Sequence, residues 1–348
     1  HINNFQIFRA SFGHFVQGMH LYPLYPKEYF DLYLYGPAFA ILMAPFAYLP
    51  LGWSVVVWNA LNAGMLFWAV WNLPLVQKQR AWILWIILNS TITALLNTQF
   101  HALCVAMILW SYILMQRGKL GWSALLIALG VFIKFYGIVG LVFFFFTKER
   151  FRYAAYLLFW FVAVFLFPFL FGGWDYTWQC YHEWMEVLSH KNNLNVDIRN
   201  LRTDVCVMGM FRRITGDGTL SNMWFLIPSL LLSAWVYFQP KKWFHVDFQL
   251  RLMALVLIYL MLASTGTESP TLIMAFPGVG LWFVLGEKSR GRWILFVLTL
   301  LISSFSPTDL FPRFLREAYV NRYALMILPL FVVWLSLLWD LRKPLQED

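Results

Sequence analysis

A succession of uncharged apolar runs constrains this chain more than any other feature. Each run approaches the roughly 20 residues that cross about 30 Å of hydrocarbon as a helix. With 61% hydrophobic and 12% charged residues, a soluble domain could not hide its apolar side chains in one core. The sequence therefore predicts a polytopic membrane protein. The runs lie at residues 53–75, 81–97, 100–116, 153–172, 220–239, 252–267, 269–286, 293–308 and 323–339.

Two further segments are ambiguous. Residues 37–50 are short and interrupted by Pro45, and residues 120–147 carry Lys134 at their middle. Each fits a short helix, a re-entrant hairpin or a broken span. With these segments, we expect an all-α transmembrane helical bundle of about 10 to 12 membrane helices, short or re-entrant ones included. Residues 1–348 are expected to form a single integral-membrane domain.

Lysines and arginines near helix ends predict the orientation, because basic residues translocate poorly and stay on the cytoplasmic side. Four clusters follow this rule: Lys148, Arg150 and Arg152; Lys241, Lys242 and Arg251; Lys288, Arg290 and Arg292; and Arg342 with Lys343. They place three segments together on the opposite face: a long external loop at 173–219, the turn at 265–271 and the loop at 303–322.

Residues 1–36 form a polar, aromatic segment that is expected to be the first external loop. Glu28 and Asp31 lie there, beside the first apolar segment, where a carboxylate needs a water-filled cavity or a function. Charge alone does not fix the side of this segment, because the number of crossings in 37–50 and 120–147 is open. The chain starts at His1 and not at a Met, so we expect a preceding segment to be missing.

Other function classes are disfavoured. The net charge is +9, and the basic residues that produce it flank apolar helices instead of forming a soluble basic stripe. Anionic lipids and phosphates are therefore the expected partners, and nucleic acid is not. No metal-ligand spacing and no Gly-rich phosphate loop occurs. Cys104 is expected in the core, whereas Cys180 and Cys206 share the long loop and are either free or paired.

Several short motifs occur in a characteristic order. They are Asn4-Phe5, Leu21-Tyr22, Tyr35-Gly36-Pro37, Pro45-Phe46-Ala47-Tyr48-Leu49-Pro50, Asn97-Thr98-Gln99-Phe100 and Ile133-Lys134-Phe135-Tyr136-Gly137. In this order the chain resembles the polyprenyl-phosphate-dependent glycosyltransferases of family 87, which are integral membrane enzymes of the GT-C superfamily. The resemblance covers most of the chain.

The resemblance implies an inverting, mannosyltransferase-like hexosyltransferase. Such an enzyme moves a sugar from a polyprenyl-phosphate carrier to a glycan or glycolipid acceptor at the exocytoplasmic face of the plasma membrane. The residues identify no definite cofactor, and dependence on a divalent metal stays open because a carboxylate can serve either as base or as ligand. The donor sugar, the acceptor and the linkage are not specified by these residues.

The chemistry needs a general base, because the acceptor hydroxyl loses a proton as the sugar passes through an oxocarbenium-like state. The resemblance places this base in an Asp-Phe pair that here reads Asn4-Phe5, and an amide cannot accept the proton. Asp31 and Glu28 are the nearest replacements, with solvated loop charges as the alternative. Glu268 is the third catalytic candidate, with a buried structural carboxylate or a turn residue as the alternative.

The leaving lipid phosphate needs cations or donors directed at its oxygens. Lys134 is the main candidate, because a lysine among uncharged residues is costly unless it meets an anion, pairs with a carboxylate such as Glu268, or snorkels. Asp309 is a candidate that could instead cap the following helix. The remaining substrate-binding candidates are Asn4, Tyr35, Gln99, Tyr136 and His182, the last among aromatic residues that are also typical of a bilayer interface.

Two alternatives to catalysis stay open. A transporter or flippase for lipid-linked saccharides would use Lys134 and Glu268 to line a path through the membrane. A non-catalytic relative that binds the lipid carrier would account for Asn4.

Overall fold

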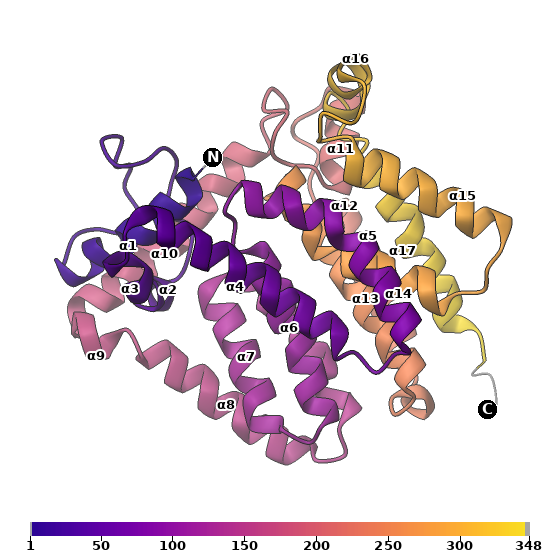
Figure 1. Ribbon diagram of the computed structural model, residues 1–348, viewed down its shortest axis with the longest axis horizontal. Helices are drawn as coiled ribbons and strands as arrows, with labels where there is room; N and C mark the ends of the chain where they lie inside the picture. The colour runs from indigo at the N-terminus through magenta and orange to yellow at the C-terminus, as the bar shows by residue number, and fades with distance from the viewer. Residues whose placement is uncertain (1, 345–348) are drawn as a thin grey trace. The chain divides into compact units, whose positions relative to one another are not determined.

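The computed structural model describes residues 2–344, and within them it is 74% helical with no strand, which confirms the all-α prediction. Figure 1 shows the arrangement. The α-helices are α1 Asn3–Val16, α2 Pro37–Leu42, α3 Ala44–Tyr48, α4 Leu51–Trp71, α5 Gln77–Leu96, α6 His101–Gln116, α7 Leu120–Ile133, α8 Arg150–Leu166, α9 Phe169–Gly172, α10 Trp174–Asn195, α11 Val207–Thr215, α12 Met223–Tyr237, α13 Val246–Ala263, α14 Phe276–Leu285, α15 Arg290–Leu298, α16 Arg313–Leu315 and α17 Ile327–Arg342. The 3₁₀ helices are η1 Phe135–Phe146, η2 Pro240–Lys242 and η3 Ser269–Met274, and the π-helical segments are η4 Thr299–Phe305 and η5 Arg316–Asn321.

Three helices of the described chain are long and apolar enough to cross a membrane. They are Leu51–Trp71, Arg150–Gly172, which joins α8 and α9, and Val246–Ala263. Five shorter apolar helices accompany them: His101–Gln116, Leu120–Ile133, Phe135–Phe146, Met223–Tyr237 and Ser269–Leu285. The chain is a membrane protein, and the expected number of crossings stays a prediction.

The chain divides into two compact units. Unit 1 contains residues 1–73 and 94–191, and unit 2 contains residues 74–93 and 192–348. The single domain that the sequence suggests stays a prediction.

Residues 120–147 form a helical hairpin in unit 1. Helix α7 ends at Ile133, Lys134 is extended (φ −154°, ψ 120°), and η1 runs back along α7. A Cβ on Gly137 would lie 2.4 Å from the carbonyl carbon of Gly130, so the two backbones touch where only glycines fit. The segment therefore folds back on itself, and whether it is re-entrant or crosses the membrane stays a prediction. Residues 37–50 are the short helices α2 and α3.

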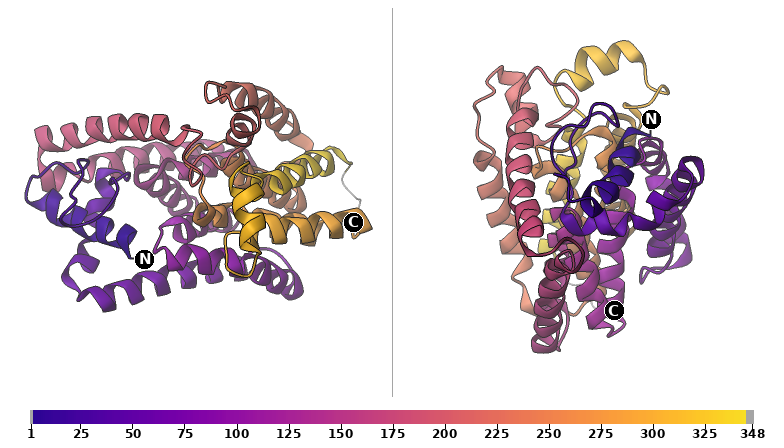
Figure 2. Two further views of the ribbon diagram at one scale, coloured as in Figure 1. Left: turned by 90° about the horizontal axis from the view of Figure 1, so that it is seen from above. Right: turned by 90° about the vertical axis from the view of Figure 1, so that its left-hand side faces the viewer.

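The first loop, residues 17–36, packs on helix α10. Figures 1 and 2 show this N-terminal segment beside α10. The contacts follow the helix: Tyr176 Oη donates to Met19 O, His20 contacts Glu183, Trp184 Nε1 donates to Leu34 O, and Lys191 pairs with Asp31. The first loop therefore lies on the same side as the start of the long polar segment, which charge alone had left open.

The long polar segment at 173–219 is largely helical, and its place outside the membrane stays a prediction. In α10, the buried residues Thr177, Cys180, Trp184 and Val187 are spaced by three and four positions. This is the helical period of one buried face. The polar residues between them lower the hydropathy of the segment and hide the periodicity.

Unit 2 gathers its charges at two ends, as the charge pattern predicted. At one end, Asp340 accepts from Arg292 at 2.7 Å and from Arg251 at 3.4 Å, and Lys343 pairs with Glu287 at 3.3 Å. These groups come from three of the predicted basic clusters.

The opposite end of unit 2 joins the long polar segment to the 265–271 turn. Asp204 N donates to Thr265 O, and the Asp204 carboxylate forms a buried, two-point pair with Arg212 at 2.8 and 2.9 Å. Arg213 donates to Asn321 O and so ties in the end of the 303–322 loop. Within unit 2, the segments expected on one face do meet.

All three cysteines are buried and free, which decides the question left open for Cys180 and Cys206. Burial raises the pKa of each of these two thiols to about 12. Both thiols therefore stay protonated near neutral pH.

Candidate functional site

Lys134 stands at the tip of the α7–η1 hairpin, and three side chains surround its ammonium. Its Nζ lies 2.8 Å from His101 Nε2 and 5.1 Å from each of the ring centres of Tyr35 and Tyr136. Because an ammonium only donates, the His101 Nε2 atom accepts and the imidazole is neutral. Aromatic faces attract a cation, so the arrangement holds the ammonium as a charge in a partly buried place. Two of the predicted residues, Tyr35 and Tyr136, therefore lie beside Lys134.

The polar break between α5 and α6, residues 97–100, positions His101 in this cluster. Thr98 adopts a left-handed conformation (φ 48°), which is unusual for a β-branched residue and marks a sharp reversal of the chain. Its carbonyl accepts from Trp58 Nε1 at 3.2 Å, and Asn4 Nδ2 donates to Asn97 O at 2.9 Å. The reversal ends at His101, the first residue of α6. Asn4 thus fixes the backbone that presents His101.

The segment Tyr33–Gly36 packs against the hairpin beside Lys134. Gly36 N donates to Ile133 O, and a Cβ on Gly36 would lie 1.9 Å from Phe132 O, so only glycine allows this approach to the hairpin. Tyr33 Oη donates to Gly36 O at 3.1 Å. Burial raises the pKa of Tyr33, which keeps its phenol as a donor. The segment is therefore held rigidly against the tip.

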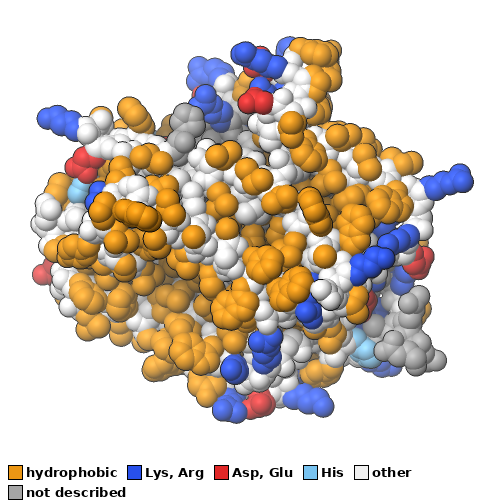
Figure 3. All heavy atoms as spheres, in the orientation of Figure 1, with side chains coloured by type: hydrophobic (Ala, Val, Ile, Leu, Met, Phe, Trp, Pro, Cys, Tyr) orange, Lys and Arg blue, Asp and Glu red, His pale blue; other side chains and the backbone are white. Residues whose placement is uncertain are grey.

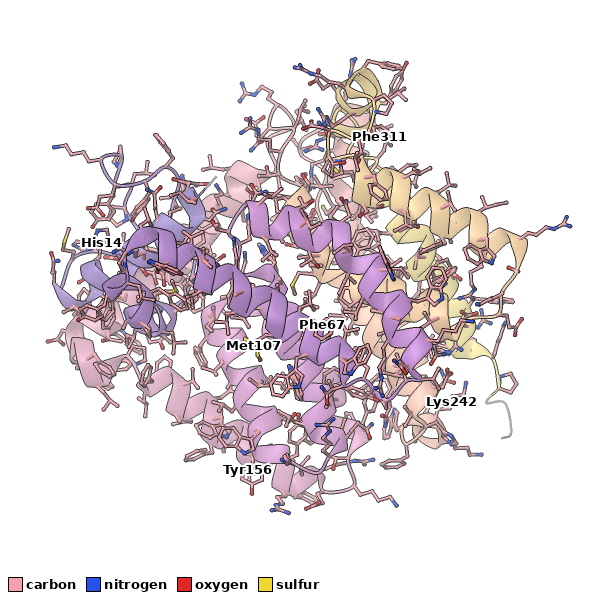
Figure 4. The ribbon with its side chains drawn as sticks, in the orientation of Figure 1. His14, Phe67, Met107, Tyr156, Lys242 and Phe311 are labelled. Carbon is pink, nitrogen blue, oxygen red and sulfur yellow. The ribbon has the colours of Figure 1, made fainter. Side chains whose placement is uncertain are left out.

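The two carboxylates of the first loop have different partners. Glu28 Oε2 lies 3.0 Å from Nε2 of the buried His14, whose ring packs 4.1 Å from that of Tyr25. Figure 4 labels His14 on α1. Asp31, with a left-handed backbone (φ 82°), is bound at both oxygens by Lys191, at 3.0 and 3.3 Å. The loop therefore offers one imidazole-linked and one lysine-bound carboxylate.

Two other predicted residues of unit 1 are placed differently. Gln99 follows Thr98 in the polar break and precedes Phe100, whose ring meets that of Tyr35 edge-on at 6.0 Å. His182 lies on the outer face of α10, with 72% of its side chain exposed, and contacts Glu186. Its neighbour Glu183 faces the first loop and contacts His20 at 2.6 Å. Neighbouring residues of a helix point in different directions, so Glu183 faces the first loop while His182 faces away from it.

The remaining candidates, Glu268 and Asp309, belong to unit 2. Glu268 precedes η3, and its backbone N donates to Thr271 Oγ1 at 2.9 Å, which agrees with its interpretation as a turn residue. Asp309 is fully exposed and lies 3.6 Å from Arg316. The helix after it begins beyond Pro312, so Asp309 does not cap it.

Sequence reasoning missed His101. The available signal was its place: a histidine directly after a polar break and at the start of an apolar helix, where burial needs a partner. The partner lies 33 residues away in the chain, so no local pattern names it.

Chemically, the Lys134 site combines one ammonium with aromatic faces and a neutral imidazole, whereas Glu28 and Asp31 have partners of their own. An ammonium in such a place can bind the oxygens of a phosphate. Among the described residues no group of three or more His, Cys, Asp or Glu side chains suits a metal ion.

Comparison with known proteins gives one finding. The sequence model of glycosyltransferase family 87 matches residues 33–265, which is more than half of the chain. The matched range contains Tyr35, Gln99, His101, Lys134 and Tyr136. None of the curated proteins matches the sequence significantly. The chain belongs to glycosyltransferase family 87 and is a membrane glycosyltransferase.

Proposed function

We propose that the protein transfers a hexosyl group from a polyprenyl-phosphate carrier to a glycan or glycolipid acceptor, with inversion, at the exocytoplasmic face of the plasma membrane. The observation that carries the proposal is the ammonium of Lys134, held by His101, Tyr35 and Tyr136 at the tip of a hairpin.

The position of this cation supports a lipid-linked donor. The 12-residue 3₁₀ helix η1 separates Lys134 from the basic cluster at Lys148–Arg152 by about 24 Å. A basic cluster of that kind marks the cytoplasmic side, so Lys134 belongs near the opposite leaflet. An isoprenoid tail could stay in the bilayer there while its phosphate meets the ammonium.

Glu28 is the better candidate for the base. In the described structure, both oxygens of Asp31 already accept from Lys191, whereas Glu28 contacts one imidazole. His14 orients the Glu28 carboxylate, as a base needs to be oriented.

The proposed reaction is an in-line displacement at the anomeric carbon. The acceptor oxygen forms a bond to the anomeric carbon, and the bond from that carbon to the phosphate oxygen breaks. The electron pair leaves with the lipid phosphate, whose charge Lys134 stabilises, and the acceptor proton passes to the Glu28 carboxylate. Single displacement inverts the anomeric centre.

The test is transfer from radiolabelled polyprenyl-phosphate hexoses by the full chain in membranes. We expect Lys134→Gln to lower kcat/KM by about a hundredfold or more, the usual effect of removing a group that stabilises a leaving oxyanion. Lys134→Arg should retain more activity than Lys134→Gln, because it keeps the charge.

Lys148→Gln is the matched control, since Lys148 is an exposed lysine at the other end of the hairpin. Activity of Lys134→Gln equal to that of the control, at equal protein level, would refute the phosphate role. Movement of lipid-linked sugar across sealed vesicles without transfer would favour the transport alternative.

A further inference from the structure

A groove opens between the first turns of α7 and α8, at the end of unit 1 away from Lys134. It has a volume of about 720 Å³. Figure 4 labels Tyr156, one of its residues, on α8. The lining residues are Gly118, Lys119, Leu120, Gly121, Trp122, Arg152, Ala155, Tyr156, Phe159 and Trp160. The groove takes no part in the proposed sugar transfer.

The chemistry of the lining changes along the groove. The cations Lys119 and Arg152 lie at the helix ends, where Figure 3 shows Lys and Arg side chains gathered along the lower edge. Trp122 lies one turn further along α7, and Phe159 lies two turns, roughly 10 Å, further along α8. Charge thus gives way to aromatic and then to apolar surface over the depth of a membrane interface.

The charge at the helix ends is positive. Arg152 contacts Glu149 at 2.8 Å, and its guanidinium also lies 5.7 Å from the centre of the Tyr156 ring. Lys119 is exposed, and Lys148 and Arg150 stand next to Glu149 in the chain. The groove lining itself holds two cations, Lys119 and Arg152, and no carboxylate, so the groove mouth attracts anions.

The walls of the groove face lipid. The span Arg150–Gly172 has only 17% of its apolar window buried within the protein. Trp122 is 63% exposed and Phe159 is 59% exposed. In a membrane protein such side chains contact acyl chains, so the groove is open to lipid along its length.

From this sequence of charge, aromatic ring and apolar wall, we propose that the groove binds an anionic phospholipid. The headgroup phosphate meets Lys119 and Arg152, the glycerol ester region lies against Trp122 and Tyr156, and one acyl chain follows Phe159 and Trp160. Charge complementarity at the mouth selects anionic over zwitterionic headgroups.

The test uses the full chain in nanodiscs that contain phosphatidylglycerol with a photoreactive diazirine in its acyl chain. Irradiation followed by peptide mass spectrometry should place adducts on the α8 segment that contains Phe159. Lys119→Gln with Arg152→Gln should lower this adduct yield about fivefold or more, because each cation near an anionic headgroup favours binding.

Lys148→Gln removes the same kind of charge outside the groove and should leave the adduct yield within twofold. The matching phosphatidylcholine probe should label α8 several-fold less. An equal yield with phosphatidylcholine, an unchanged yield in the double variant, or loss of the adduct on adding millimolar inorganic phosphate would each overturn the proposal. Thermal unfolding in detergent confirms that the variants are folded.

Discussion

At the scale of single residues, the site depends on charges whose partners lie far away in the chain. Lys134 and His101 are in contact although 33 positions separate them in the sequence, and Asp31 and Lys191 are in contact across 160 positions. A buried or half-buried charge needs such a partner, and only the fold can supply it.

The two loop carboxylates can be separated by mutation. We expect Glu28→Gln to lower kcat of the proposed transfer by about a hundredfold or more, because the amide cannot take the acceptor proton. Asp31→Asn should act chiefly on stability of the first loop, through loss of the Lys191 pair. Initial rates at saturating donor measure the difference. If Asp31→Asn abolishes turnover while Glu28→Gln keeps it, the roles are reversed.

His101 is expected to act as a positioning residue for Lys134. His101→Leu removes the acceptor at 2.8 Å and should lower kcat/KM about tenfold, the usual scale of a hydrogen bond to a charged group. His101→Gln keeps an acceptor near the position of Nε2 and should recover most of the activity. Equal losses in the two variants would indicate that packing alone matters at this site.

At the scale of elements, the hairpin of α7 and η1 presents Lys134 because its two arms touch at glycines. A Cβ on Gly137 would lie 2.5 Å from the Cα atom of Gly130, closer than real contacts allow. The arms must therefore separate if Gly137 is replaced.

We expect Gly137→Ala to lower the free energy of unfolding by about 1 to 3 kcal/mol, the usual cost of overpacking. Gly64→Ala in α4 is the control, because a Cβ at Gly64 meets nothing within 4 Å. Thermal unfolding of both variants in detergent checks the expectation. A Tm for Gly137→Ala no lower than that of the control would show that the arms can move apart without cost.

At the scale of the whole molecule, orientation is the property that mutation tests most directly. The first loop and the basic end of α8 belong to opposite sides if the proposed topology is correct. Phe30 is 77% exposed in the first loop, and Glu149 is exposed at the basic end.

We expect a membrane-impermeant maleimide to label Phe30→Cys on intact cells and Glu149→Cys only after the membrane is opened. The natural thiols give little background, since all three are buried and free. Labelling of both variants on intact cells, or of Glu149→Cys alone, would reverse or refute the orientation.

Sequence by itself determined the class, the approximate positions of the three helices long enough to cross a membrane, and the family. These depend on local quantities: hydropathy, run length and ordered short motifs such as Tyr35-Gly36-Pro37. The amphipathic helix α10 was not predicted, because its buried residues are separated by polar ones and the hydropathy of a window averages over both faces.

Tertiary structure alone decided how Lys134 is held, which of His182 and Glu183 faces the first loop, and that residues 120–147 turn back as a hairpin. The physical reason is the same in each case. A charge or a close backbone approach is stabilised by groups distant in the chain, and the pairing of distant groups is set by packing and not by local composition.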